Sequence, residues 1–595
     1  MRTTWLTKAI VGGGLALLAA VPFLGVNRFW VYFITITLAQ TILLASLNLT
    51  FGYAGLISLG HNALYAIGGY ATAYFSVSVG LPVGASIALG LVFGVLAGLT
   101  LASTTYRTRA VYFGIITLAF LFLTFETVSK WPVLGGFRGF PNIPGLSFGG
   151  IQFGRNEYYW FALGVFVLAM GALQQLSGSA IGRSFVAIRE NEAAASSLGI
   201  NPFATKSLNL AVSGGLAGLA GALFAHVAGG IFPESASFSS AIRLFVAIVV
   251  GGTGTFAGPL VGMGVVATID RFTVNWTTTQ PIIFSLMLIG SLAVMRLGIV
   301  GTILTSRFGR LFLRLPVVPV VADASKAGVL DDARSAVPAR DTMLEVVGLT
   351  KRFDGVTALA GADLSVERGT IHGLIGPNGS GKTTLVNCIT GFMRFDGGRV
   401  SLDGHEVARP RPWAMARRGV LRIFQHSETF GRLLVIQNVM VGLHLRADRH
   451  LLRCMLPLRR RRRVERGLAT DALAVLTSVG LAHRALMSVS ALPYGEQRLL
   501  EIARAVAARP RLLILDEPAT GLTSTELSRL AELLRSLRAA GVTILLIEHN
   551  MEFVMDLVDR VTVLERGRPI AVGEPERVQR NPLVVEAYLG ERVPA

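Results

Sequence analysis

The sequence is poor in cysteine, and its first half is poor in charge. Its 595 residues include only two cysteines, Cys388 and Cys454, which are too few for a disulfide framework or a cysteine-based zinc site. Residues 1–300 contain only 14 of the 55 basic and 6 of the 36 acidic residues. Such a segment is typical of bilayer-spanning helices, whereas the charge-rich remainder is typical of a soluble domain. We therefore expect two domains that face two different solvents.

The excess of basic residues does not indicate a nucleic-acid-binding protein. The formal net charge is +19, but no nucleic-acid-reading motif accompanies it. Arginines beside the cytoplasmic face of a membrane, opposite anionic lipid, account for the charge better. The expected partners therefore include a lipid bilayer and exclude nucleic acid.

Apolar runs near the length needed to cross a bilayer, about 20 residues, recur through residues 9–300. They are Ala9–Val26, Val31–Thr50, Leu56–Val79, Leu81–Thr105, Val111–Val128, Tyr158–Leu176, Leu208–Ala228, Leu244–Ile269 and Ile282–Val300. The first run is interpreted as a retained helix because no small-residue cleavage site follows it. The run Leu244–Ile269 is rich in glycine around Pro259 and is interpreted as two short helices around a break. The sequence thus predicts a polytopic α-helical membrane domain of about ten spans.

The chain is expected to divide into three parts. Residues 1–305 form the membrane domain, residues 306–341 a linker rich in proline and aspartate, and residues 342–595 an α/β nucleotide-binding domain. Ten spans starting from a cytoplasmic N-terminus return the chain to the cytoplasm. The α/β domain is therefore expected there.

A glycine-rich phosphate-binding motif follows the apolar run Ile371–Ile375 and precedes a helical run. It comprises Gly376, Pro377, Asn378, Gly379, Ser380, Gly381, Lys382 and Thr383, followed by Thr384. Glycines turn backbone N–H groups toward phosphate oxygens at a helix N-terminus. Lys382 is expected to reach the terminal phosphates of ATP, and the Thr383 hydroxyl to bind Mg²⁺. The alternative is a flexible turn, which the strand–loop–helix order disfavours.

A second apolar strand, Leu512–Leu515, ends in two adjacent carboxylates. Buried charge of this kind calls for a cation and a chemical task. Asp516 is expected to hold Mg²⁺, and Glu517 to act as the general base on the attacking water. The alternative is a strand end whose acids are solvated.

The remaining motifs resemble those of ABC ATPases over residues 344–590. By this resemblance Gln425 is the Q-loop residue and a further Mg²⁺ ligand, His549 the switch histidine, and Phe353 the aromatic that stacks on adenine. The signature motif, which serves the nucleotide of the opposite subunit, is Pro493, Tyr494, Gly495, Glu496 and Gln497. The sequence departs from the usual pattern at Pro493, where the family has a serine. This removes a hydroxyl that would touch the γ-phosphate.

The first half resembles the permeases of branched-chain amino acid ABC importers. The resemblance rests on residues 48–61, 112–120 and 251–259, and on the polar segment after Gly182. It implies a coupling helix that contains Arg183, Arg189, Glu190 and Gly199. Asn48 and His61 are candidates for the substrate pathway, although helix packing with an interhelical hydrogen bond is the alternative for both.

Together the resemblances imply a fused permease and ATP-binding subunit of an ABC importer in the bacterial inner membrane. It is expected to use ATP and Mg²⁺ to import branched-chain or other hydrophobic amino acids. The implied partners are a second permease and a second ATP-binding subunit, or a second copy of this chain, and an extracytoplasmic substrate-binding protein. Three alternatives stay open: an importer of urea or short-chain amides, an ABC exporter, and a non-transport ABC ATPase.

Overall fold

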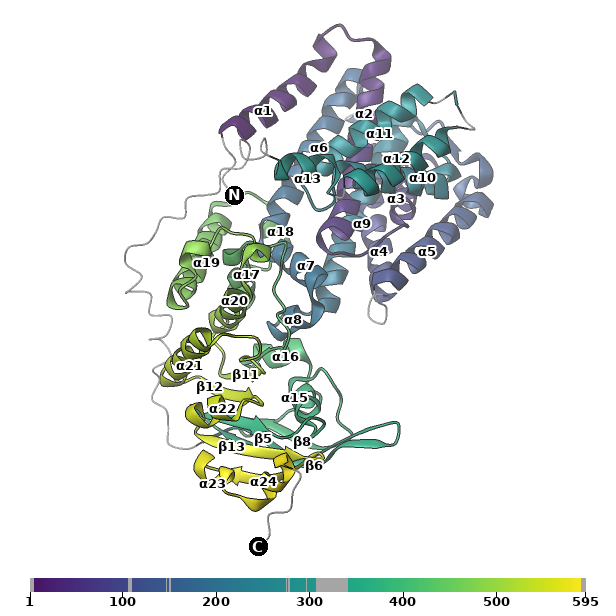
Figure 1. The fold of residues 1–595 in the computed structure, drawn as a ribbon. Coiled ribbons are helices and arrows are strands. Elements are labelled where there is room, and N and C mark those ends of the chain that lie inside the picture. The colour runs from purple at the N-terminus through teal and green to yellow at the C-terminus, as the bar shows by residue number, and fades with distance from the viewer. Residues whose placement is uncertain are drawn as a thin grey trace. The chain divides into compact units, whose positions relative to one another are not determined.

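The computed structural model describes residues 5–104, 110–145, 147–148, 151–273, 275–276, 279–295, 297–306 and 341–589. The chain forms two compact units, drawn in Figure 1. A helical unit comprises Met1–Arg189, Phe203–Val318 and His450–Pro457, and an α/β unit comprises Glu190–Pro202, Pro319–Arg449 and Leu458–Ala595. Almost all of the expected linker lies outside the described residues.

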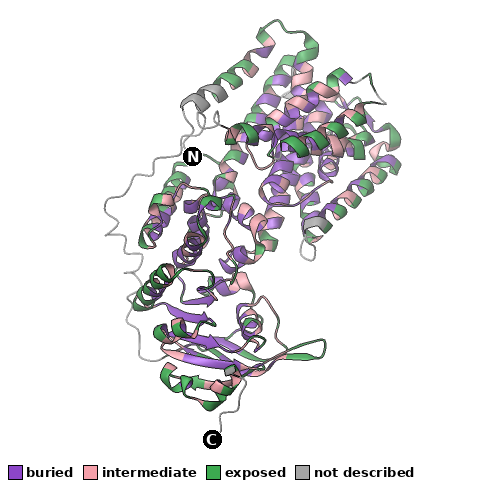
Figure 2. Ribbon diagram, in the orientation of Figure 1, coloured by how far each residue is buried: buried purple, intermediate pink, exposed green. Residues whose placement is uncertain are grey.

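The helical unit is built from apolar helices. They are α1 (Trp5–Ala20), α2 (Arg28–Leu47), α3 (His61–Val77), α4 (Val83–Thr104), α5 (Ala110–Lys130), α6 (Arg155–Ser177), α7 (Ala180–Glu190), α9 (Pro202–Ala228), α10 (Phe238–Gly251), α11 (Gly258–Thr273), α12 (Gln280–Val294) and α13 (Gly298–Thr305). In the described part of the chain, six helical stretches are long and apolar enough to cross a membrane. Large apolar side chains such as Leu123 and Ile289 are exposed on α5 and α12 (Figure 2), as expected of helices that face lipid. The total of ten spans stays a prediction.

The expected break in Leu244–Ile269 is confirmed, and it contacts a second break. Helix α10 ends at Gly251 and α11 begins at Gly258. Helix α2 in turn runs into the π-helical turn Asn48–Tyr53. The Asn48 side chain joins the two breaks: its Nδ2 donates to Thr255 O at 2.8 Å, and its Oδ1 accepts from Gly254 N at 2.8 Å. These bonds satisfy two backbone groups of the break between α10 and α11, which apolar surroundings require.

Glycines let three helices of the helical unit approach backbone to backbone. On α4 and α9, a Cβ at Gly94 would lie 2.3 Å from Gly214 O, and a Cβ at Gly98 would lie 2.1 Å from Leu210 O. A Cβ at Gly68 on α3 would lie 2.3 Å from the Cα of Gly218. Small residues at such crossings are what close packing of membrane helices needs.

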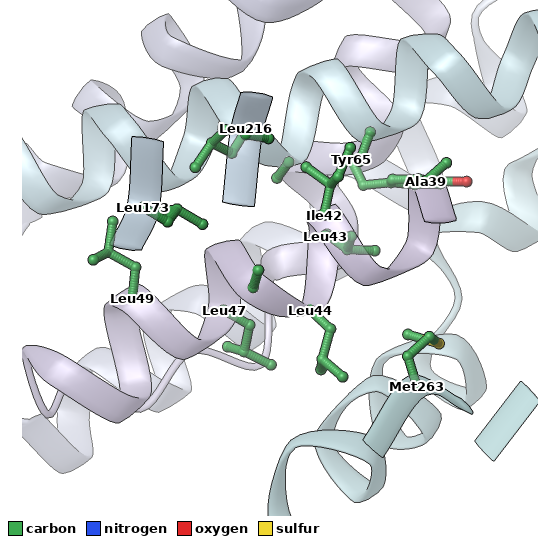
Figure 3. Packing of buried hydrophobic residues seen from close by; sticks show 14 of the residues in the cluster. Ala39, Ile42, Leu43, Leu44, Leu47, Leu49, Tyr65, Leu173, Leu216 and Met263 are labelled. Atoms are coloured by element: carbon green, nitrogen blue, oxygen red, sulfur yellow. The ribbon is translucent and has the colours of Figure 1, made fainter. Parts of the chain in front are cut away.

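Larger apolar side chains fill the core beside this contact, as Figure 3 shows around Leu43 of α2 and Tyr65 of α3. Leu173 of α6, Leu216 of α9 and Met263 of α11 belong to the same cluster. The cluster therefore joins five helices into one packed body.

The α/β unit contains two sheets. The larger has the order β10 (Val420–Ile423), β11 (Leu512–Asp516), β12 (Thr543–Ile547), β7 (Ile371–Ile375), β13 (Arg560–Glu565) and β14 (Arg568–Gly573), and all neighbours are parallel except β13 and β14. The smaller is antiparallel, in the order β6 (Val356–Glu367), β5 (Thr342–Phe353), β8 (Gly397–Leu402) and β9 (His405–Glu406). In the larger sheet Asp516 pairs with Ile547, and Ile547 with Leu374. The carboxyl ends of these strands therefore meet at one edge, where ligands bind in such sheets.

The helices of the α/β unit follow the strands. They are α8 (Glu192–Ser197), α15 (Lys382–Thr390), α16 (Pro412–Arg417), α17 (Val435–Gly442), α19 (Arg459–Ser478), α20 (Tyr494–Ala507), α21 (Ser524–Ala539), α22 (Met551–Leu557), α23 (Pro575–Gln579) and α24 (Pro582–Leu589). Two segments lie in a different unit from the one expected from sequence order. Glu190–Pro202, which contains the C-terminal part of the expected coupling segment Arg183–Gly199, belongs to the α/β unit, and His450–Pro457 belongs to the helical unit. There α18 (Leu451–Met455) packs on α6, and Cys454 joins the apolar core.

We expect the α4–α9 glycine contact to be essential for stability. Gly214→Ala places a Cβ 2.4 Å from Gly94 O, so the helices must separate at a cost of about 1–3 kcal/mol. The measurement is thermal unfolding of the detergent-purified chain.

The matched control is Gly164→Ala on α6, where nothing lies within 4 Å of the new Cβ. This change should leave the melting temperature unchanged or raise it, because alanine favours helix over glycine by up to about 1 kcal/mol. Equal stability of the two variants would contradict the role of the contact.

Candidate functional site

The glycine-rich loop joins β7 to α15 and takes a backbone path that side chains would block. Gly376 has φ +150°, and a Cβ there would lie 2.1 Å from Leu564 O. Gly381 has φ +101° and precedes the first residue of α15. The loop therefore follows a glycine-dependent path into a helix N-terminus, the arrangement that phosphate sites use.

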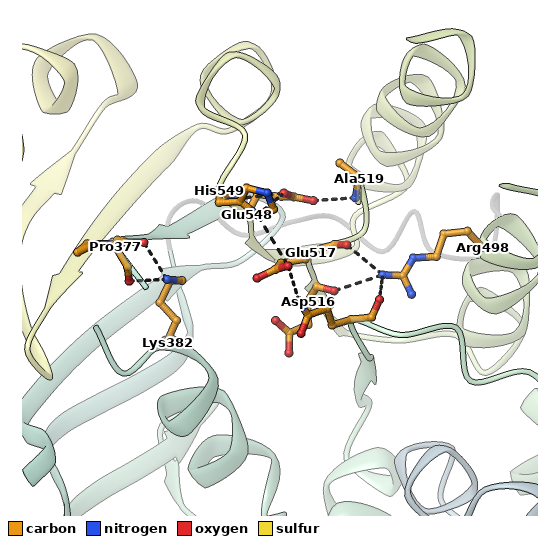
Figure 4. A network of polar contacts seen from close by, with 10 residues as sticks. Pro377, Lys382, Arg498, Asp516, Glu517, Ala519, Glu548 and His549 are labelled. Carbon is orange, nitrogen blue, oxygen red and sulfur yellow. Dashed lines mark hydrogen bonds and ion pairs between the residues drawn. The ribbon is translucent and has the colours of Figure 1, made fainter. Parts of the chain in front are cut away.

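Lys382 lies within this loop. Its Nζ donates to Gly376 O at 2.8 Å and to Pro377 O at 3.0 Å (Figure 4). Burial lowers the pKa of Lys382 from its ordinary value, and the carboxylates of Glu517 and Asp516 oppose that shift. The ammonium is thus desolvated and bonded only to neutral loop oxygens, so an anionic phosphate is a stronger partner for it.

Three of the predicted residues meet at the carboxyl ends of β11 and β12. Gln425 Nε2 donates to Glu517 Oε2 at 2.6 Å, and His549 Nδ1 lies 3.7 Å from the same oxygen. Figure 4 shows His549 and Glu517 facing each other. The structure thus brings together the Q-loop residue, the expected base and the switch histidine.

The backbone at Glu517 is strained. Its φ of +47° lies in the left-handed region, which a non-glycine residue adopts at a cost. Its N–H donates to Ile547 O at 2.8 Å, which holds it at the end of β12. Strain of this kind persists at functional sites where neighbouring contacts fix the residue.

Asp516 has a partner that the sequence analysis did not identify. Its Oδ2 accepts from Arg422 Nη2 at 2.7 Å, and both side chains are almost fully buried. Arg422 Nη1 also donates to Asn387 Oδ1 at 2.5 Å. The signal in the sequence was a charged residue inside the short apolar strand Val420–Ile423.

Arg498 on α20 was also missed, although it has many contacts in this site. It is 1 % exposed. Its Nη1 donates to Phe424 O at 2.6 Å, and its Nη2 donates to the carbonyls of Gln425, Asp516 and Glu517 at 3.1–3.3 Å. One guanidinium therefore ties the Q-loop to the strand end that carries both carboxylates, as Figure 4 shows for the strand.

Buried carboxylates complete this network. Glu501, one turn after Arg498 on α20, accepts from Arg498 Nη1 at 2.8 Å. Glu548 accepts from Ala519 N at 2.7 Å and from His549 N at 3.2 Å, while burial raises its pKa above the ordinary value. Glu548 thus positions the backbone on both sides of the catalytic cluster.

The signature residues lie at the start of α20. Pro493 is its N-cap and provides no side-chain cap. Glu496 pairs with Arg484 at 3.3 Å, and Gln497 Nε2 donates to Leu492 O at 2.9 Å. Tyr494 is exposed, whereas Gly495 is buried against Glu526 of α21. Among the described residues no hydrogen bond joins this motif to the glycine-rich loop.

The remaining nucleotide candidates lie on the surface of the α/β unit. Phe353 is 42 % exposed at the end of β5, with Lys351 Nζ 5.3 Å from its ring centroid. Thr383 is exposed in the first turn of α15, and Thr384 follows it. An exposed ring and hydroxyl are available to a ligand.

The coupling segment binds near the Q-loop inside the α/β unit. Glu190 Oε1 lies 3.3 Å from Arg432 Nε, and Asn191 Nδ2 donates to Glu428 Oε2. Gly199, with φ +90°, ends the segment beside Leu445. Glu428 N donates to Glu501, the partner of Arg498. The segment therefore contacts the loop that carries Gln425.

The other two coupling residues lie in the helical unit. Arg189 Nη1 donates to the carbonyls of Phe51 and Gly52, in the π-helical turn. Arg183 is buried on α7. Consecutive residues, Arg189 and Glu190, thus bind different units of the chain.

Of the two pathway candidates, Asn48 bonds to a distant segment of the helical unit, whereas His61 bonds to a residue just before it in the chain. Asn48 bonds across the two helix breaks, and His61 Nδ1 lies 2.8 Å from Ser58 Oγ at the start of α3. A direct role in substrate passage stays a prediction for both.

Three family models match the chain in order. The permease component of the branched-chain amino acid transport system matches residues 30–296, and the ABC transporter model matches residues 359–520. The branched-chain amino acid ATP-binding cassette transporter model matches residues 568–594.

Curated relatives match 42 % of the chain and nearly all of their own length. The high-affinity branched-chain amino acid transport ATP-binding protein BraF of Pseudomonas aeruginosa is 43 % identical over 250 residues, which is 98 % of that protein. The corresponding protein LivG of Escherichia coli K12 is 42 % identical over 250 residues, also 98 % of its length. The probable branched-chain amino acid transport ATP-binding protein LivG of Archaeoglobus fulgidus is 34 % identical over 256 residues, or 95 % of its length. The permease match lies outside the ABC transporter match, so this chain joins two components.

Arg498→Met should strongly destabilise the α/β unit. It leaves the Glu501 carboxylate buried without its partner, which costs about 3–5 kcal/mol. The measurement is denaturant unfolding of the purified chain with and without nucleotide. Nucleotide should stabilise the unchanged protein but not the variant.

The control is Arg535→Met, which breaks an exposed pair with Asp556 worth roughly 0–1 kcal/mol. If both variants unfold at the same denaturant concentration as the unchanged protein, Arg498 does not hold the site together.

Proposed function

This chain belongs to the branched-chain amino acid ABC transporter family, and from that premise we propose that it imports branched-chain or other hydrophobic amino acids. The observation that carries the proposal is the joining of the permease match and the ATP-binding match in one polypeptide. The family descriptions and the relatives' names refer to branched-chain amino acids. This favours amino acids over urea or short amides. The chain is an ATP-hydrolysing transporter that contributes one permease and one ATPase.

Hydrolysis is assigned to the cluster around Glu517. Glu517 accepts a proton from the attacking water as general base. Gln425 and His549, which lie against its carboxylate, orient that water and sense the γ-phosphate. Lys382 and the N–H groups of Gly376–Thr384 hold the phosphates.

The donor set also fits a magnesium ion. The Thr383 hydroxyl, the Gln425 amide oxygen and the Asp516 carboxylate are hard oxygen ligands of the kind that Mg²⁺ prefers. The ion would neutralise phosphate charge when bound. The Asp516 carboxylate must share or release its contact with Arg422 before it can bind such an ion directly.

Transport requires nucleotide-driven motion to reach the membrane. We assign this to the segment from Arg183 to Gly199. Because this segment contacts Glu428 and Arg432, a rearrangement of the Q-loop displaces the segment. Arg189, which binds the π-helical turn, transmits the displacement to that turn. The result is a switch between outward and inward access.

The complete importer is proposed to contain further subunits. The signature residues serve a nucleotide on an opposite subunit, so a second ATP-binding domain and a second permease are needed. They come from separate subunits or from a second copy of this chain. An extracytoplasmic binding protein delivers the substrate, and the α/β unit faces the cytoplasm of a bacterial inner membrane.

Glu517→Gln should retain ATP binding but lose turnover, because an amide cannot accept the proton from water. Hydrolysis should fall roughly a hundredfold or more. The measurement is uptake of labelled leucine and labelled urea, with ATP hydrolysis, by cells or vesicles that contain the chain and its partner subunits.

Glu532→Gln, an exposed position on α21, is the matched control and should behave like the unchanged protein. Leucine uptake that disappears only in Glu517→Gln supports the proposal. Urea uptake without leucine uptake would keep the mechanism and overturn the substrate, and normal uptake by Glu517→Gln would overturn the catalytic assignment.

Pro493→Ser should leave transport intact or increase it. Serine supplies the missing N-cap of α20, worth about 0.5–2 kcal/mol, and restores a hydroxyl on the nucleotide-facing motif. The melting temperature and the ATPase rate are compared with those of Pro493→Ala, which has neither effect. A severe loss of transport in the serine variant would show instead that proline itself is required by the loop.

A further inference from the structure

A cavity of about 460 Å³ lies in the helical unit among α2, α3, α9, α10 and α11. Its volume falls within the roughly 300–1,000 Å³ typical of small-molecule sites. It is lined by both apolar and charged side chains, and the charged ones are Glu234, Arg243 and Asp270. Residues 1–300 contain only 14 basic and 6 acidic residues, yet three of these charges line this one cavity.

Arg243 of α10 and Asp270 of α11 face each other without forming a tight ion pair. Arg243 Nη1 lies 3.9 Å from Asp270 Oδ1, whereas a charge-assisted hydrogen bond is about 2.7–2.9 Å long. Arg243 Nη2 donates to Ser240 Oγ at 3.0 Å, and Gln280 Nε2 donates to Asp270 Oδ1 at 2.9 Å. Neutral side chains thus hold a cation and an anion at separate points of the wall.

Much of the remaining wall is apolar. Tyr65 and Phe224, whose ring centroids lie 5.8 Å apart, line the cavity together with Met263 and Val266 of α11. Aromatic and aliphatic groups of this kind match a hydrocarbon side chain. The cavity therefore combines a cation, an anion and an apolar surface.

We propose that this cavity binds the α-amino acid zwitterion on its way through the permease. Arg243 binds the α-carboxylate, Asp270 binds the α-ammonium, and the apolar part of the wall receives the side chain. The assignment rests on the proposed function and extends it, because an uncharged amide such as urea would leave both charges unmatched.

The test measures ligand binding by the purified full chain with its partner subunits in lipid nanodiscs, without a binding protein. Leucine should raise the melting temperature. Leucinamide, which lacks the carboxylate, and 4-methylpentanoate, which lacks the ammonium, should bind at least roughly tenfold more weakly, because each loses a hydrogen-bonded charge. Arg243→Gln and Asp270→Asn should each weaken leucine binding roughly ten- to a hundredfold.

Arg271→Gln is the matched control. It lies next to Asp270 but stacks on Phe29, 4.6 Å from the ring centroid, and does not line the cavity. Its leucine affinity should equal that of the unchanged protein. The melting temperatures of all three variants without leucine show whether they are folded.

Two results would overturn the assignment and leave the proposed function standing. One is ATP-driven leucine uptake with unchanged leucine binding in Arg243→Gln and Asp270→Asn. The other is equal binding of leucine and leucinamide. The proposed function itself fails on a different observation, namely the absence of ATP-driven uptake of any hydrophobic amino acid by the unchanged complex.

Discussion

The nucleotide site depends on one buried guanidinium. Arg498 is 1 % exposed, so its donors must find protein acceptors or cost free energy. It finds them in the carbonyls of Phe424 and Gln425 on one side and of Asp516 and Glu517 on the other. The Q-loop and the catalytic strand end are therefore held in register by a residue that belongs to neither, and α20 carries that residue together with the signature motif.

The same helix connects hydrolysis to the coupling segment. Glu501 pairs with Arg498 and also accepts from the backbone N–H of Glu428, whose carboxylate accepts from Asn191. Burial raises the pKa of Glu428 because solvent stabilises its carboxylate poorly. The Asn191 amide stabilises that carboxylate by a hydrogen bond. A chain of hydrogen bonds therefore runs from the Gln425 backbone through Arg498, Glu501 and Glu428 to Asn191.

Linear motifs made much of this site predictable. The residues of Gly376–Thr384 and the pair Asp516–Glu517 are contiguous, and strand order alone brings them to one sheet edge. The partners Arg422 and Arg498 were not predicted, because pairing among buried charges depends on contacts between distant segments. The break after Gly251 followed from local glycine and proline content, but its bond to Asn48 did not. The packing of α18 on α6 was not predicted either, because the apolar side chains of α18 resemble those of any soluble helix.

In the helical unit, the helix breaks link the coupling segment to the proposed substrate cavity. Glu190 is one peptide bond from Arg189, which binds two carbonyls of the turn Asn48–Tyr53. Asn48 in that turn holds the break between α10 and α11 through Gly254 and Thr255. Those two helices carry the facing charges of the cavity, Arg243 and Asp270. In an intact helix the backbone N–H and C=O groups form hydrogen bonds within the helix, whereas at a break they form them with neighbouring segments. Two successive sets of hydrogen bonds, those of Arg189 and those of Asn48, therefore join the end of α7 to the two helices that carry the charges of the proposed cavity, which is the connection that the proposed transport cycle requires.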